Sequence, residues 1–308
     1  MSQKNYGIII GFFAGILVMA YLIFSAPEEQ KALVPGQVFN TTQAYILPVA
    51  ETSYFPILKN NRPKPEINAK AALVYDLQSG RFLYSKESKA KVAVASLTKL
   101  MTAVIVKERL YGSEVVAVPS SAVKVDEEKQ TLYLDEKLTV DELMTLMLVE
   151  SSNDAAHALA DYTSKRGFNL VEAMNQKAEL LGMTDTTFKD PAGLSDEGYS
   201  SSEDLIKLVK YSLKHPSIWS TLNIQEVNIS PASGISRTVK STNQLLGTMP
   251  NILGGKTGYT EGALGCMILV VNVPGQEDKI ISIVLGSTER FTDTKKLINW
   301  VSSAYRWE

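Results

Sequence analysis

The feature that most constrains this chain is an uncharged run near its N-terminus, from Tyr6 to Ala26. As a helix this run would span about 31 Å, the thickness of the hydrocarbon core of a bilayer. Lys4 precedes it and acidic residues follow it, a bias that favours a cytoplasmic N-terminus. We therefore expect residues 1–5 in the cytoplasm, residues 6–26 as a single-pass signal anchor of the cytoplasmic membrane, and all later residues on its outer (periplasmic or extracellular) face. The alternative is a cleaved signal peptide, although a bulky phenylalanine stands where a small residue should precede the cleavage site.

Three glycines recur every four residues within this run, at Gly7, Gly11 and Gly15. On a helix they line one face, which lets two helix backbones approach closely. The anchor is therefore a candidate contact for a homodimer. A simple membrane span is the alternative, because glycine is common in such segments.

Prolines crowd the segment that follows, and six of the chain's 12 fall between Pro27 and Pro65. Its apolar residues keep neither the period of a strand nor that of a helix for long. We expect a proline-rich tether over residues 27–65 and one large domain over residues 66–308. The alternative is that part of the tether packs on the domain surface.

Beyond the tether the hydrophobic pattern changes from strands to helices and back again. Residues 69–75 and 81–85 predict a hairpin around a glycine turn. Helices are expected at 96–111, at 141–149 after a Thr139/Glu142 capping box, and at about 154–164, 170–181 and 202–213. Strands return after Lys256, and a last helix is expected over about 292–305. This order predicts an α+β fold with a central antiparallel sheet built from both ends of the chain and flanked by helices.

Charge and residue inventory restrict the chemistry. The formal net charge is −2, and no basic run offers a nucleic-acid surface. One cysteine, Cys266, and two histidines, His157 and His215, argue against a metal site, and no cofactor is expected. We expect Cys266 and His157 to be structural. A nucleophilic hydroxyl would then need a lysine as its base.

Ser-x-x-Lys supplies such a pair, because residues i and i+3 share a helix face. The pattern occurs three times, beginning at Ser88, Ser96 and Ser121. Only Ser96, with Lys99, begins a strongly apolar helix, where the helix N-terminus favours a developing oxyanion and burial disfavours the lysine ammonium. The alternative is a helix cap beside a solvated lysine.

Two further patterns could complete a site. Ser151-Ser152-Asn153 places a hydroxyl and an amide in one turn, although Ser-x-Asn recurs at Ser241-Thr242-Asn243. Lys256-Thr257-Gly258 occurs once and follows two glycines. A lysine and a hydroxyl beside a residue without a side chain could dock a substrate carboxylate close to the backbone.

Ser-x-x-Lys, Ser-x-Asn and Lys-Thr-Gly in this order are the motif set of penicillin-binding proteins and serine β-lactamases. Within that superfamily the chain resembles the low-molecular-mass D-alanyl-D-alanine carboxypeptidases, a serine peptidase family, from about Ala69 to Trp300. Stretches such as DLQSGRFLYSK, GMTDTTFKDPAGL, STNQLLG and VLGSTERFTD extend the likeness. The resemblance implies a β-lactamase/transpeptidase-like fold and removal of the terminal D-Ala from peptidoglycan stem peptides, with β-lactams as covalent inhibitors.

The resemblance also implies roles for nine residues. Ser96 would be acylated, and Lys99 would accept its proton. Ser151 would relay a proton to the leaving amine, Asn153 would hold the peptide amide, and Lys256 would sustain the electrostatics near Ser151. The substrate would contact Thr257, Gly258, Tyr259 and Arg290: Thr257 and Arg290 as partners of its carboxylate, and the N–H groups of Ser96 and Tyr259 as the oxyanion hole.

Three other functions remain open. A β-lactamase shares the acylation step, but the loop FKDPAGLSDEGYSS lacks the Glu-x-x-Leu-Asn element of class A enzymes. A D,D-endopeptidase that cuts cross-links would differ only in the part of the cleft that holds the leaving group, which would have to admit a second stem peptide. A non-enzymatic penicillin-binding sensor would keep acylation without turnover.

Overall fold

The structure is a computed structural model, and it describes residues 55–59, 62–125, 131–232 and 235–308. The expected anchor, its glycine face and most of the tether lie outside these residues. Within the described ranges, no helix combines the length and the apolar character needed to cross a bilayer. The anchor, the homodimer and the membrane location therefore stay predictions.

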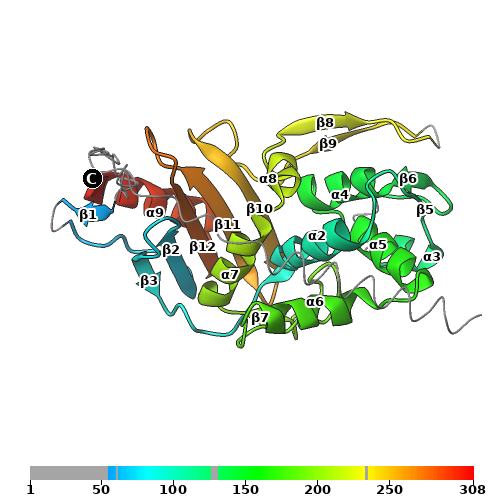
Figure 1. The fold of residues 1–308 in the computed structure, drawn as a ribbon, viewed down its shortest axis with the longest axis horizontal. Helices are drawn as coiled ribbons and strands as arrows, with labels where there is room; N and C mark the ends of the chain where they lie inside the picture. Colours follow the sequence, from blue (N-terminus) through cyan, green and yellow to red (C-terminus); the bar gives the residue numbers. More distant parts are fainter. Residues whose placement is uncertain (1–54, 60–61, 126–130, 233–234) are drawn as a thin grey trace, which may run out of the picture. The chain divides into compact units, whose positions relative to one another are not determined.

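A five-stranded antiparallel sheet forms the centre of the domain, in the order β10-β11-β12-β2-β3. Its strands are β2 (Ala71–Asp76), β3 (Phe82–Lys86), β10 (Ile252–Thr260), β11 (Leu264–Asn272) and β12 (Lys279–Ser287). The early hairpin β2-β3 thus lies beside the late strands, with Ala72 opposite Val284 (Figure 1). This confirms the prediction of an α+β fold whose sheet is built from both ends of the chain.

Short strand pairs surround this sheet. They are β1 (Pro56–Leu58) with β13 (Tyr305–Trp307), β4 (Val92–Ala93) with β7 (Tyr199–Ser200), β5 (Val115–Ala117) with β6 (Lys137–Thr139), and β8 (Glu226–Ile229) with β9 (Arg237–Lys240). All four pairs are antiparallel. The first pair joins the two ends of the described chain at one end of the domain (Figure 1).

Helices cover both faces of the sheet. They are the 3₁₀ turn η1 (Ala95–Leu97), α2 (Thr98–Arg109), α3 (Ser120–Val123), α4 (Val140–Val149), α5 (Asn153–Lys165), α6 (Leu170–Leu180), α7 (Ser202–Ser212), α8 (Pro216–Leu222) and α9 (Arg290–Ala304). α9 packs on one face with its own apolar cluster, and the other helices gather on the opposite side. The predicted capping box opens α4: Glu142 N–H donates to Thr139 Oγ1, and Thr139 N–H donates to the Glu142 carboxylate.

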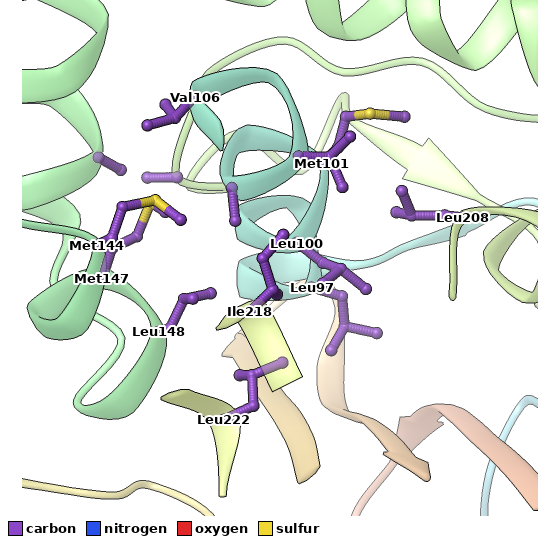
Figure 2. Close-up of a cluster of buried hydrophobic side chains, with 14 of the residues drawn as sticks. Leu97, Leu100, Met101, Val106, Met144, Met147, Leu148, Leu208, Ile218 and Leu222 are labelled. Atoms are coloured by element: carbon purple, nitrogen blue, oxygen red, sulfur yellow. The ribbon is translucent and has the colours of Figure 1, made fainter. Parts of the chain in front are cut away.

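Helix α2 is the core of the helical side. Its residues from Thr98 to Val106 are all buried, because the sequence is apolar around the whole helix and neighbours cover every face. Figure 2 shows side chains from α4, α7 and α8 surrounding Leu100. A helix fixed on all sides can hold the side chains of its first turn in place, and that turn lies beside β10.

The structure differs from the sequence-based expectations at two boundaries. β10 begins at Ile252 rather than at Lys256, because pairing with β11 extends the strand across two glycines of low strand propensity. β1 lies within the segment expected to be tether, and Ile57 pairs with Arg306. Part of that segment therefore packs on the domain, which was the alternative interpretation.

Candidate active site

The first Ser/Lys pair lies where η1 leads into α2. Lys99 Nζ donates to Ser96 Oγ at 2.8 Å, to Asn153 Oδ1 at 2.7 Å and to the carbonyl of Ala192 at 2.7 Å. The Lys99 side chain is fully buried, while Ser96 is only partly covered. The structure thus brings together a hydroxyl, an amine and an amide that the sequence spreads over 58 positions, from Ser96 to Asn153.

The two other Ser-x-x-Lys serines lie elsewhere. Ser88 donates to the carboxylate of Glu203 at 2.8 Å, and Ser121 lies within the short helix α3. Neither lies at the start of the buried helix. The surrounding sequence, rather than the Ser-x-x-Lys motif itself, therefore distinguishes Ser96 and Lys99 from the other two pairs.

Backbone strain and close packing shape the nucleophile turn. Ala95 has a φ of 47°, a left-handed value that is rare for a residue with a Cβ. A Cβ on Gly193 would clash with the Ala95 carbonyl, and a Cβ on Gly258 would lie 3.0 Å from the Ser96 nitrogen. Two glycines therefore let a loop and a strand pack closely against the turn that carries Ser96.

The second Ser/Lys pair joins the α4–α5 turn to β10. Ser151 has a φ of 67°, and its Oγ accepts a hydrogen bond of 2.8 Å from Lys256 Nζ. Lys256 is 1% exposed and also donates to the Thr257 carbonyl at 2.8 Å. Residues 105 positions apart thus form a pair with the same geometry as Ser96 and Lys99.

Electrostatics weakens proton binding at Lys256. Burial lowers its pKa well below the ordinary lysine value, and the nearby positive charges of Lys99 and Arg290 lower it further. Two buried lysines in one site repel each other, so the second proton is held less tightly than the first. Such a site can pass protons between hydroxyls without a histidine.

The edge of β10 carries the expected substrate contacts. Thr257 is buried, and its Oγ1 lies 2.6 Å from Thr242 Oγ1. Tyr259, which follows Gly258, is 59% exposed. At this edge Tyr259 is therefore accessible, while the Thr257 hydroxyl contacts a second hydroxyl.

Arg290, at the start of α9, lies near this edge but turns toward an aromatic ring. Its guanidinium carbon is 6.0 Å from the centre of the Tyr259 ring, and its Nε is buried without a hydrogen-bond partner. Burial lowers the pKa of Arg290, although the group keeps its charge in the physiological range. Among the described residues no hydrogen bond joins Arg290 to Thr257. Its expected role as carboxylate partner stays a prediction.

Sequence reasoning missed two contributors. Thr242 belongs to the second Ser-x-Asn pattern, which carried no assigned role, yet it contacts Thr257. Asp190 accepts backbone N–H groups of Ala192, Gly193, Leu194 and Ser195, and so fixes the loop whose Ala192 carbonyl accepts from Lys99. The only signal for Asp190 was a turn sequence, Asp-Pro-Ala-Gly, which is typical of any loop.

His157 and Cys266 lie near the site. His157 is one turn into α5, its Nε2 is buried without a partner, and burial lowers its pKa. Cys266 is fully buried in β11, and burial raises the pKa of its thiol to about 11. An un-ionised buried thiol is a poor nucleophile, consistent with the structural role expected for it.

The arrangement is that of a serine acyl-transfer site in which lysines replace histidine. The family profile for D-alanyl-D-alanine carboxypeptidase matches residues 58–289. The chain is 31% identical over 246 residues to the D-alanyl-D-alanine carboxypeptidase DacF of Bacillus subtilis, covering 77% of this chain and 63% of DacF. It is 30% identical over 254 residues to the D-alanyl-D-alanine endopeptidase of Escherichia coli, covering 78% and 79%.

A solved structure agrees with these sequence matches. Penicillin-binding protein D2 from Listeria monocytogenes, in its ampicillin-bound form, superimposes with a TM-score of 0.67 at 32% identity over 78% of this chain and all of that one. The fold is therefore that of a penicillin-binding protein. The chain belongs to the D-alanyl-D-alanine carboxypeptidase family.

Proposed function

We propose that this protein is a serine D-alanyl-D-alanine carboxypeptidase that removes the terminal D-Ala from peptidoglycan stem peptides. One observation carries the proposal: two Ser/Lys pairs, each with a 2.8 Å hydrogen bond, lie in one site beside the open edge of β10. The chain spans 63% of the length of DacF.

Acylation begins at Ser96. Its Oγ attacks the carbonyl carbon of the penultimate D-Ala, and its proton passes to Lys99 Nζ, 2.8 Å away, which would act as the base after releasing a proton of its own. The carbonyl oxygen becomes an oxyanion, which the N–H groups of Ser96 and Tyr259 would stabilise. A Cβ on Gly258 would lie only 3.0 Å from the Ser96 nitrogen, and this close packing of β10 against the Ser96 turn supports the assignment.

Collapse of the intermediate requires a proton on the departing D-Ala amine. Ser151 can supply it and recover one from Lys256, which donates to its Oγ. The lowered pKa of Lys256 suits a group that must give up a proton. The Thr257 hydroxyl, which contacts Thr242, would donate a hydrogen bond to the substrate carboxylate. Asn153 would hold the peptide amide. Water then attacks the acyl carbon: its oxygen goes to the released peptide, its proton passes through Ser151 to Lys256, and Lys99 returns the proton it took to Ser96 Oγ.

A β-lactam would acylate the same serine, because its ring amide takes the place of the peptide bond. A β-lactamase would also need a carboxylate that activates water. Asp190, the acid in the loop beside Lys99, has both oxygens engaged by backbone N–H groups. This supports slow release of the drug and therefore a penicillin-binding enzyme rather than a β-lactamase.

The test is direct. The full chain is incubated with a pentapeptide stem that ends in D-Ala-D-Ala, and the products are analysed by mass. Loss of one D-Ala, abolished by Ser96→Ala and unchanged by the matched Ser88→Ala, supports the proposal. Covalent penicillin labelling without peptide turnover would instead favour a penicillin sensor.

A D,D-endopeptidase is the second candidate, because the relative from E. coli carries that name. The same acyl-enzyme would form, but the leaving group would be the amine of a second stem peptide. Cross-linked dimeric stem peptides separate the two: cleavage of the cross-link faster than release of terminal D-Ala would make the endopeptidase the main activity.

We also propose that the domain works on the outer face of the cytoplasmic membrane, held there by residues 6–26. The uncharged run and the charge bias around it support this location. Protease digestion of intact spheroplasts should remove the domain and leave the N-terminus protected. Cross-linking in membranes, compared with a Gly7/Gly11/Gly15→Leu variant, tests the proposed homodimer; equal cross-linking in both would exclude this face as its contact.

A further inference from the structure

The end of the domain where β1 meets β13 exposes apolar side chains among cations. We propose that this end, which we call the β1–β13 end, rests on an anionic lipid bilayer. It is defined by the apolar residues Phe55, Ile57, Leu58 and Phe82 and by the cations Lys59, Arg81 and Arg306. The inference is independent of the peptidase chemistry.

Exposure of these apolar residues is unusually concentrated. Their exposed fractions are 43% for Phe55, 41% for Ile57, 51% for Leu58 and 51% for Phe82. Of the 12 large hydrophobic side chains that are exposed in the described part of the chain, four lie here. Single exposed hydrophobic residues are ordinary, but a group of them on one surface indicates a binding face.

Contacts link Phe55 to the last residue of the chain and to Arg81, the residue before β3. Phe55 N–H donates to the Glu308 carbonyl at 2.8 Å, which continues the β1–β13 ladder. Arg81 lies over the Phe55 ring, 5.5 Å from its centre, and Phe82 follows it in β3. Figure 1 shows β1 and the C-terminus at the end of the domain that is formed by the sheet.

Cations accompany the apolar group. Ile57 pairs across the ladder with Arg306, so that both side chains share one face. Arg306 Nε also lies 2.9 Å from the Glu308 carboxylate, while Lys59 and Arg81 form no ion pair among the described residues. Apolar side chains that insert, beside cations that meet phosphates, match the surface of an anionic membrane.

A cavity of about 500 Å³ opens beside the same strands. Apolar side chains from α9, β11 and β12 line it, including Ile298, Val271 and Ile280, and Lys59 and Arg306 also belong to its lining. A pocket with an apolar interior and cations in its wall suits an amphiphile with an anionic head.

The sequence adds a reason why the partner is a bilayer. The uncharged run ends at Ala26, and the described chain enters the domain at Phe55, so 28 residues separate them. At about 3.1 Å per residue these reach at most roughly 90 Å, which keeps the β1–β13 end at a high effective concentration near any membrane that holds the run. Weak lipid contacts are enough under that condition.

The test uses the full chain in nanodiscs of phosphatidylcholine, alone or mixed with phosphatidylglycerol. A nitroxide label is placed at Leu58→Cys and, as the matched control, at Leu180→Cys, another exposed leucine, at the end of α6. Cys266 is buried and escapes labelling under native conditions. Penicillin labelling of each variant verifies the fold. Collisions with oxygen and with a water-soluble nickel chelate report whether each label lies in lipid or in water.

We expect the label at position 58 to lie in lipid in the anionic discs and the label at position 180 to stay in water. Changing Lys59, Arg81 and Arg306 to Gln should lower the ratio of lipid-bound to free end by on the order of 100-fold, about fivefold for each charge. A label at 58 that stays in water, or that enters neutral and anionic discs equally, overturns the proposal. Lipid contact at both positions also overturns it, as does spin–spin broadening between labels at 58, which would mean that a second copy covers the surface.

Discussion

The domain buries two pairs of like charges, and they have opposite characters. Lys99 and Lys256 lie beside β10, with exposed fractions of 0% and 1%. Asp76 and Asp278 lie where β2 meets the start of β12, at 0% and 2%. Burial lowers the pKa of Lys256; burial, with the neighbouring carboxyl of Asp76, raises the pKa of Asp278 to about 6. In each pair, the charged form of one member is therefore disfavoured: Lys256 in the first and Asp278 in the second.

Their partners differ. Each lysine donates to a serine hydroxyl at the cleft. Asp278 accepts backbone N–H groups of Gln78 and Lys279, and Asp76 accepts from Ser79 and from the Trp307 indole at 2.8 Å. Buried like charges cost folding free energy at both places. The lysine pair lies against the hydroxyls of Ser96 and Ser151. The aspartate pair instead links the β2–β3 hairpin to β13.

Removal of Lys99 should have the largest effect. In Lys99→Ala, acylation of Ser96 by penicillin should fall by about 10⁴-fold or more, because the nucleophile loses its base. Lys91→Ala is the matched control, since Lys91 ends the unused Ser88 motif and should leave acylation unchanged. Stopped-flow labelling measures both rates. Acylation near the normal rate in Lys99→Ala would remove this lysine from the mechanism.

Lys256→Met should separate activity from stability. Acylation should fall by roughly 10²- to 10³-fold through loss of preorganised charge. The folded pKa of Lys256 lies below its unfolded value, so its charge destabilises the fold at neutral pH, and this cost disappears as pH rises toward the unfolded pKa. Urea unfolding should therefore show a more stable variant at pH 7 and a smaller difference at pH 10. A variant that is less stable at both pH values would contradict this account.

Thr257→Val should affect substrates with a free C-terminal carboxylate more than their amides. A lost hydrogen bond to a charged group costs roughly 1.5 to 3 kcal/mol, or about 10- to 150-fold in kcat/KM. Parallel assays on the acid and amide forms of one peptide give the ratio. An equal loss for both forms would show that Thr257 does not bind the carboxylate.

Thr242→Val should have a smaller effect, about fivefold in kcat/KM for the acid substrate, because it removes one neutral hydrogen bond to Thr257. The double variant with Thr257→Val should lose less than the product of the two single losses, since Thr242 acts through the Thr257 hydroxyl. Fully multiplicative losses would mean that the two residues act independently.

Asp278→Asn should leave acylation unchanged and alter only stability. The folded pKa of Asp278, about 6, lies above its unfolded value of 3.8, so its contribution to stability is largest in acid and is lost as pH rises from about 4 through 6. The variant should therefore be more stable than the wild type at pH 8, by about 1 to 3 kcal/mol. Glu197→Gln, an exposed carboxylate, is the control. A wild-type stability that rises between pH 4 and pH 7 relative to Asp278→Asn would refute the assignment.

Local patterns predicted the part of the site whose residues are close in sequence, although Ser96 lies in η1 and Lys99 in α2 rather than in one helix. Ser96 and Lys99 are in contact, and the apolar sequence around them is enough to place α2 in the core. The contact between Ser151 and Lys256 cannot be read from spacing, because 105 residues and several elements separate them. There only the likeness to a known family connected the motifs.

Other features depend on tertiary contacts that no local pattern records. Thr242 gains its place because its N–H donates to the Val149 carbonyl at 3.1 Å, which brings it to the end of α4. β1 is three residues in a proline-rich segment, and it is a strand only because β13 pairs with it. The sequence also did not indicate that β10 begins before Lys256. Gly254 and Gly255 have low strand propensity, and they belong to the strand only because β11 pairs with them.

The order of strands in the sheet sets a condition on when the enzyme can first react. Leu73 pairs with Ile283, more than 200 residues later, and Gly258 must reach the Ser96 turn before the nucleophile is supported on both sides. Contacts so distant in sequence form slowly and cannot form on a growing chain until its last strands have emerged. We therefore expect the proposed site to be assembled only after the last strands of the sheet have been made. A chain that stops before β12 carries the Ser-x-x-Lys and Lys-Thr-Gly sequences without the sheet that brings them together.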